Sequence, residues 1–206
     1  MYTPPAFKEE RIEVLHEAMR SAGLATLVTL TAEGLVASHV PMLLDPEPAP
    51  FGSLIGHVAR PNPQARAEPT VQALAIFQGA DAYVTPSWYA TKRATGKVVP
   101  TWNYVAVHAY GTLELFDDPA RLLDVVTRLT QREEGGRPAP WAVSDAPADF
   151  TQAMLRGIVG FALPIARLEG KWKMSQNRPA EDRAGVAAGL AAEGRDEVAA
   201  LIERSE

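Results

Sequence analysis

Three short segments of the sequence gather cationic, hydrogen-bonding and aromatic side chains. They read GHVARPNPQ (residues 56–64), GKVVPTWNYVAVHAYG (residues 96–111) and GKWKMSQNR (residues 170–178). Arginine and lysine form charge-assisted hydrogen bonds to phosphate, and backbone amides at a helix start add further donors. Because each segment lies at the end of an expected strand, together they predict a site for a small anionic ligand.

Each segment also has an ordinary structural interpretation. His57, Arg60 and Asn62 crowd around a turn, and a Pro/Asn turn can simply be hydrated. The basic strand end that finishes at Arg178 can equally be solvated. The ligand interpretation therefore depends on the recurrence of such segments in a chain whose net charge is −5.

The middle segment predicts a strand from about Trp102 with an unusual alternation. One face carries Trp102, Tyr104, Ala106, His108 and Tyr110, and the other carries Thr101, Asn103, Val105, Val107 and Ala109. A half-buried strand ordinarily places aliphatic residues inside and charged residues outside. Here one face carries aromatic and hydrogen-bonding groups, which suit contacts other than core packing.

A fourth segment, Ser38-His39-Val40-Pro41, places two polar residues and a proline in the middle of an expected strand. Proline removes a donor from the hydrogen-bond ladder. This strand is therefore either an edge strand with exposed polar residues or a place where the sheet opens toward a ligand.

Composition limits the function classes. The absence of cysteine excludes disulfides, thiolate catalysis and cysteine-ligated metals. A pI near 5.5 argues against generic nucleic-acid binding, because phosphate neutralisation supplies most of that affinity. The four histidines form no metal motif, and the chain has no G-x-G-x-x-G, P-loop or G-x-S-x-G signature. No catalytic residue and no metal site are predicted. Without a membrane span or a signal peptide, the protein is expected in the cytoplasm.

The elements that position these residues are mostly short strands. A helix is expected over Glu9–Ala22, and strands over the ranges Leu24–Thr31, Leu35–Leu44, Phe51–Ala59, Val71–Gln78, Tyr83–Thr85 and Trp102–Phe116, with a hairpin turn at 32–34. Evenly spaced short strands indicate an antiparallel sheet that curls into a barrel. The expected fold class is mainly β with flanking helices (α+β).

The second half of the chain is expected to add helices around one more strand. Asp118-Pro119 is typical of a helix start, and Gly135-Gly136 of its end. A short helix over Asp149–Leu155 and a long strand over Gly157–Lys173, bent at Pro164, follow. A helical tail is expected over residues 179–206, broken near Gly194, and residues 1–206 are interpreted as one domain.

The motifs resemble the PaiB family, described as FMN-binding negative transcriptional regulators with a flavin-binding split barrel related to pyridoxamine-phosphate oxidase. The resemblance is carried by Tyr2-Thr3-Pro4-Pro5 with Phe7, by VTPSWY (residues 84–89) and by the three segments above. It spans the chain from Tyr2 to about Asp182.

The resemblance implies an antiparallel split β-barrel and a homodimer that holds FMN between its subunits. Ser38, His39 and Val40 would flank the isoalloxazine, and His57, Arg60 and Asn62 would hold the phosphate end. Lys97, Thr101, Trp102 and Asn103 would approach from the facing subunit, and Lys173, Gln176 and Arg178 would complete the pocket. The aromatic face that begins at Trp102 then suits either the flavin or the dimer interface.

Two functions remain open at this point, beside a third interpretation in which the pocket is empty or structural and the scaffold is retained for dimerisation. One is PaiB-type negative regulation of transcription, and the alternative is an FMN-dependent oxidoreductase or flavin reductase that uses NAD(P)H. The charge of the tail does not favour direct DNA reading. The tail has three bases, Arg183, Arg195 and Arg204, and a larger number of acids, namely Glu181, Asp182, Glu193, Asp196, Glu197, Glu203 and Glu206. Such an excess of acid repels a phosphate backbone.

Overall fold

The computed structural model describes residues 1–32, 34–66 and 71–204. Its helices are α1 (Ile12–Ser21), α2 (Ala90–Thr95), α3 (Pro119–Glu134), α4 (Ala148–Leu155), α5 (Ala180–Ala192) and α6 (Asp196–Glu203). Its strands are β1 (Lys8–Glu9), β2 (Ala25–Thr31), β3 (Gly34–Val40), β4 (Leu43–Asp45), β5 (Ser53–Ala59), β6 (Gln72–Val84), β7 (Thr101–Thr112), β8 (Glu114–Phe116) and β9 (Ile158–Lys173). No helix among these residues has the length and apolar character needed to cross a membrane.

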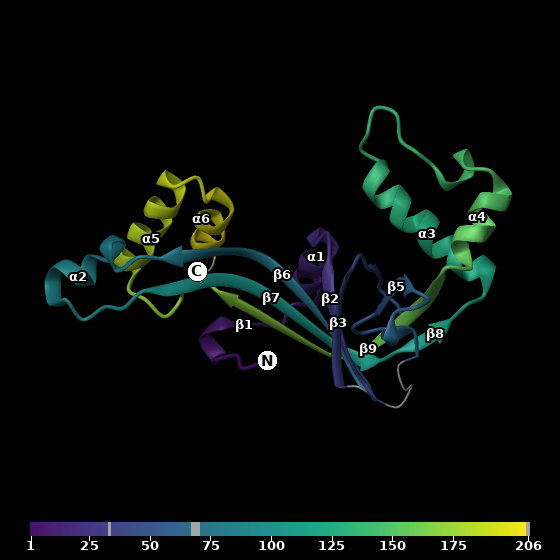
Figure 1. Ribbon diagram of the computed structural model, residues 1–206. Helices are drawn as coiled ribbons and strands as arrows, with labels where there is room; N and C mark the ends of the chain where they lie inside the picture. Colours follow the sequence, from purple (N-terminus) through teal and green to yellow (C-terminus); the bar gives the residue numbers. More distant parts are fainter. Residues whose placement is uncertain (33, 67–70, 205–206) are drawn as a thin grey trace. The chain divides into compact units, whose positions relative to one another are not determined.

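The strands form an unclosed, mainly antiparallel sheet in the order β3-β2-β6-β7-β9-β5-β4 (Figure 1). The short strands β1 and β8 pair with opposite ends of β9. This is the predicted mainly-β fold with flanking helices. The long strands β6, β7 and β9 each contribute to two compact units, and the units are described separately below.

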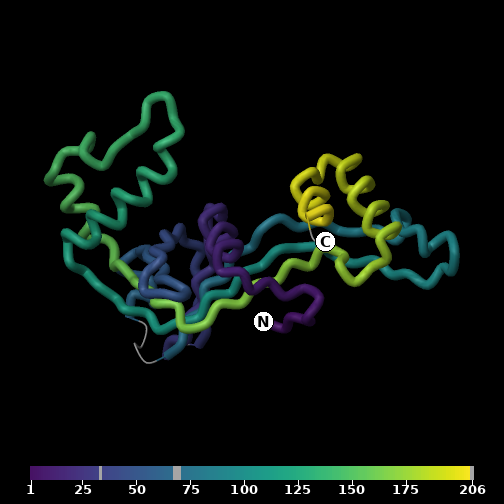
Figure 2. The backbone as a smooth tube through the Cα atoms, turned by 180° about the vertical axis from the view of Figure 1, so that it is seen from behind, coloured from purple at the N-terminus to yellow at the C-terminus, as the bar shows by residue number. Residues whose placement is uncertain are grey.

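The first unit comprises residues 1–15, 78–107 and 169–206. Helices α5 and α6 lie beside the ends of the long strands in both views (Figures 1 and 2). Their apolar side chains Val186, Leu190 and Ile202 are buried against Tyr89, which directly precedes α2, and Met174, which directly follows β9. The predicted helical tail is therefore part of the core of this unit, with its break at Gly194, whose φ of 71° favours glycine.

The second unit comprises residues 16–77 and 108–168. Helix α3 begins as predicted, because the side chain of Asp118 accepts a hydrogen bond from the Arg121 backbone N–H and Pro119 occupies the first turn. Its buried residues Val125 and Leu129 pack with Leu43 of β4. The 3₁₀ turn η2 (Pro63–Arg66) joins β5 to the segment before β6.

The structure differs from the sequence expectations at several places. The two strands expected at 71–78 and 83–85 are one strand, β6, whose buried positions shift by one between Phe77 and Ala82. The expected strand 35–44 is interrupted at Pro41 and becomes β3 and β4. The strand expected over 102–116 breaks at Leu113. Helix α2, which the sequence analysis did not predict, ends at Gly96 with a φ of 68°. The predicted turn at 32–34 includes Glu33, which lies outside the described residues.

Candidate functional site

The end of β9 places a lysine against the start of β7. Lys173 Nζ donates hydrogen bonds to the hydroxyl of Thr101 and to the carbonyl oxygen of Trp102, the latter at 2.7 Å. An ammonium group has three donors. Two are held by β7, which fixes the direction of the third.

Three cations gather around this strand end. Burial, and then repulsion from Lys171 and Arg178, holds the pKa of Lys173 below its ordinary value. Lys171 is only 8% exposed, and its Nζ donates to the carbonyl oxygen of Tyr2 at 3.1 Å. An anion would relieve the mutual repulsion of these cations.

Rings surround the same cations. The Lys171 ammonium lies 5.1 Å from the centre of the Tyr104 ring, and the Arg178 guanidinium lies 4.9 Å from that of Tyr89. Trp102 is 52% exposed and meets the edge of Tyr83, with ring centres 5.9 Å apart. The sequence analysis did not select Lys171, although its spacing of two from Lys173 on a strand places both side chains on one face.

The loop after β9 is held by its own polar side chains. Asn103, fully buried, exchanges hydrogen bonds with the Ser175 hydroxyl at 3.1 and 3.2 Å. Ser175 has a φ of 63°, which marks a strained turn for a residue other than glycine. Gln176 accepts from the backbone N–H of Met174 and donates to the carbonyl oxygen of Trp172. Asn103 and Gln176 therefore position this loop, with Lys173 before it and Arg178 after it.

The second unit brings together another part of the predicted set. Asn62 donates to the Ser38 hydroxyl at 2.9 Å, and its side-chain oxygen accepts from the Gln64 backbone N–H. His39 Nδ1 lies 3.0 Å from the Thr26 hydroxyl on the paired strand β2. Ser38 and Asn62, far apart in sequence, thus meet as two polar groups in one place.

Gln64 organises this region, and the sequence analysis did not select it. Its side chain is fully buried, and its amide nitrogen donates to the carbonyl oxygens of Leu27 and Val36 and to the Thr29 hydroxyl. It therefore ties the turn η2 to both β2 and β3. A glutamine within a polar turn gives no local signal for such long-range bonds.

The remaining predicted residues have different surroundings. His57 is half-buried on β5, its Nδ1 has no hydrogen-bond partner among the described atoms, and burial lowers the pKa of its ring. Val40 is buried at the end of β3. Arg60 already donates from Nε and Nη2 to the carbonyl oxygens of Arg156 and Ile158. The Lys97 side chain is exposed and contacts none of the other predicted residues through a hydrogen bond or ion pair that the structure describes.

The aromatic face of β7 is confirmed as a surface distinct from the core. Asn103, Val107 and Ala109 are fully buried, whereas Tyr104, His108 and Tyr110 on the other face are half-buried. In the second unit the Arg167 guanidinium lies 3.5 Å from the centre of the Tyr110 ring. Cations of β9 therefore cover part of this face, as Lys171 does in the first unit.

The open antiparallel sheet with flanking helices is the architecture of flavin-binding split-barrel proteins. The FAD- and heme-binding protein of Mycobacterium smegmatis has the same fold, with a TM-score of 0.62, 19% identity, and coverage of 88% of this chain and 80% of that one. The flavocytochrome Anf3 of Azotobacter vinelandii matches with a TM-score of 0.61 and 14% identity, over 86% of this chain and 75% of its own. These likenesses establish the fold.

The family follows from the sequence comparisons. The family model described as "Putative FMN-binding domain" matches residues 1–167, and the chain belongs to this family. The protease synthase and sporulation protein PAI 2 of Bacillus subtilis is 31% identical, over 90% of this chain and 87% of its own. An uncharacterized protein of Aspergillus fumigatus is 36% identical, over 92% of this chain and 90% of its own. The resemblance to PaiB is thus confirmed, and FMN is the cofactor.

The donor set fits this cofactor. FMN carries a dianionic phosphate and a flat ring system, and the first unit offers a cluster of three cations beside exposed aromatic rings. The described residues contain no group of three or more His, Cys, Asp or Glu side chains arranged to hold a metal ion.

Proposed function

We propose that this protein is an FMN-binding negative regulator of transcription of the PaiB type. The observation that supports FMN binding best is the cluster of Lys171, Lys173 and Arg178, in which burial, and then repulsion from the other two cations, lowers the pKa of Lys173. The name of the Bacillus subtilis relative refers to protease synthesis and sporulation, which supports a regulatory role.

In this proposal Lys173 and Arg178 bind the FMN phosphate. The third donor of Lys173 and the guanidinium fork of Arg178 supply charge-assisted hydrogen bonds. Ser38, His39 and Val40 are proposed to flank the isoalloxazine. The resemblance places His57, Arg60 and Asn62 at the phosphate end, and that assignment stays a prediction. The protein acts as a homodimer, in which Lys97, Thr101 and Trp102 come from the facing subunit together with Lys173, to which Thr101 and Trp102 are hydrogen-bonded within one chain. Asn103, which is buried against Ser175, positions the loop that precedes Arg178. FMN supplies redox-active ring chemistry, and these side chains bind and orient it.

A comparison of FMN with riboflavin tests the phosphate assignment, because riboflavin lacks only the phosphate. We expect Lys173→Met to weaken FMN binding about 10- to 100-fold, the range for loss of a hydrogen bond to a charged group. Riboflavin binding should change little. If FMN and riboflavin binding are weakened equally, Lys173 does not contact the phosphate. Lys8→Met is the matched control, because Lys8 is exposed and paired with Glu10.

The proposed dimer is tested by light scattering on the FMN-loaded protein. A monomer that binds one FMN with undiminished affinity would overturn the shared site, whereas a dimer that retains FMN is expected.

Transcript levels test the regulatory role. Deletion of the gene should raise the levels of a defined set of transcripts. The levels of the same transcripts should rise in a strain that carries Lys173→Met. If deletion raises none, the regulator proposal fails even when FMN binding holds. Helices α5 and α6 are not expected to contact DNA, because acids outnumber bases there.

Reduction by nicotinamide separates the regulator from the enzyme alternative. Anaerobic mixing of the FMN-loaded protein with NADH or NADPH should leave the flavin absorbance unchanged. Rapid bleaching would instead favour the oxidoreductase or flavin reductase.

A further inference from the structure

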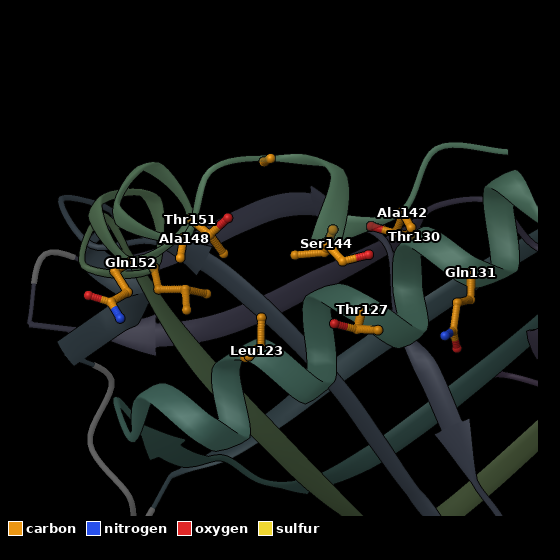
Figure 3. A pocket seen from close by; sticks show the side chains of 12 residues that line it. Leu123, Thr127, Thr130, Gln131, Ala142, Ser144, Ala148, Thr151 and Gln152 are labelled. Carbon is orange, nitrogen blue, oxygen red and sulfur yellow. The ribbon is translucent and has the colours of Figure 1, made fainter.

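Two adjoining cavities lie along α4 in the second unit, whereas Lys171, Lys173 and Arg178 belong to the first unit. The first has a volume of about 530 Å³ and lies between α3, α4 and the segment that joins them (Figure 3). The second, of about 410 Å³, shares Gln152 and Leu155 with the first. Both volumes fall within the roughly 300–1,000 Å³ typical of small-molecule sites.

The first cavity has an uncharged lining. Leu123, Val143 and Leu155 give it apolar walls, and Thr127 and Ser144 add hydroxyl groups. Figure 3 shows Leu123 and Thr127 on α3 and Ser144 on the connecting segment around the same space. No residue that lines it carries a charge, so the cavity suits the uncharged body of a ligand.

The second cavity supplies a net positive charge. Arg60, Arg156 and Asp117 line it. The Arg156 guanidinium makes no hydrogen bond or ion pair within the described part of the chain, whereas Arg60 is held by backbone carbonyls. Asp117 lies 3.8 Å from Arg60, which leaves one positive charge unbalanced. One unpaired guanidinium matches one carboxylate, with which it can form two parallel hydrogen bonds.

We propose that these cavities form a binding site for a small amphipathic monocarboxylate. The apolar body lies between α3 and α4, and the carboxylate lies against Arg156. The arginines of α3 do not compete for it, because Arg121, Arg128 and Arg132 are paired with Glu114, Asp45 and Glu133. Such a ligand differs in charge from FMN, whose phosphate is a dianion.

Calorimetric titration of the FMN-loaded protein with octanoate tests this site, with octan-1-ol as the uncharged control. We expect octanoate to bind once per chain, and octan-1-ol to bind at least about tenfold more weakly, because it cannot form the charge-assisted bonds. Arg156→Ala should weaken octanoate binding by a similar factor, and Arg156→Lys should weaken it less. Arg137→Ala is the matched control, since Arg137 lies in the same region but outside both cavities.

Two variants that fill the first cavity complete the test. Ser144→Trp and Ala148→Trp change exposed residues on different sides of it, so at least one should fold, and either should abolish octanoate binding. FMN affinity should stay unchanged in every variant. The proposal is overturned if octanoate does not bind, or if it binds the two tryptophan variants as tightly as the wild type. It is also overturned if Arg156→Ala weakens FMN binding. If octanoate does not bind but FMN does, the proposed FMN site is unaffected.

Discussion

Lys173 donates a hydrogen bond to the carbonyl oxygen of Trp102, 2.7 Å away, and so joins the last residue of β9 to the beginning of β7. This bond fixes the ammonium group in a place where Lys171 and Arg178 repel it. The ligand-free protein therefore holds a cation that an anion can stabilise.

Inorganic phosphate should raise the Tm of the ligand-free protein, because it binds the folded cluster and not the unfolded chain. Thermal unfolding monitored by circular dichroism gives the shift. In Arg178→Ala the shift should be smaller, since one of the three cations is absent. A full shift in this variant would mean that phosphate binds elsewhere.

His57 should make the stability of the protein depend on pH. Burial lowers the pKa of its ring below the ordinary 6.5, so the unfolded chain binds the proton more readily. This contribution is fully present above pH 6.5 and is lost as the pH falls through the folded-state pKa. When the pH is lowered from 7.5 to 5, the free energy of unfolding measured with denaturant should fall less in His57→Phe than in the wild type. An equal fall would assign the dependence to other groups.

Asn103→Ala should lower the free energy of unfolding by about 1–3 kcal/mol, because it leaves the buried Ser175 hydroxyl without its partner. Urea unfolding measures this change. Asn177→Ala, which alters an exposed residue of the same loop, is the control and should stay within about 0.5 kcal/mol.

Gln64→Ala should destabilise the protein by about 2–5 kcal/mol, since it removes three buried hydrogen bonds and leaves a cavity. Gln72→Ala, at an exposed position on β6, is the matched control. Hydrogen exchange should show faster opening of β2 and β3 in the Gln64 variant only. Unchanged exchange there would contradict the bridging role of Gln64.

Local patterns predicted much of this architecture. The period of two along β7 identified the buried and the half-buried faces, and Asp118-Pro119 identified the start of α3. The motif resemblance also selected Ser38 and Asn62, which the fold brings together. The period of the pattern and the cap residues are local properties, so they can be recognised before the fold is known.

Contacts between distant residues could not be predicted in the same way. Gln64 reaches Leu27 across 37 positions, and nothing in the turn PNPQ distinguishes that bond from hydration. Arg60 was selected for its charge, but its position beside the end of α4 decides which groups it meets. Whether it also contacts FMN stays a prediction.

The burial of α5 and α6 bears on where the chain can be shortened. The family match ends at residue 167, but Leu190 and Ile202 are fully buried beside Tyr89 and Met174. A chain ended at the family boundary would lose Lys171 and Lys173 and expose the apolar surface around Tyr89. Exposed surface of that kind promotes aggregation, so truncation there should yield insoluble material rather than a minimal flavoprotein.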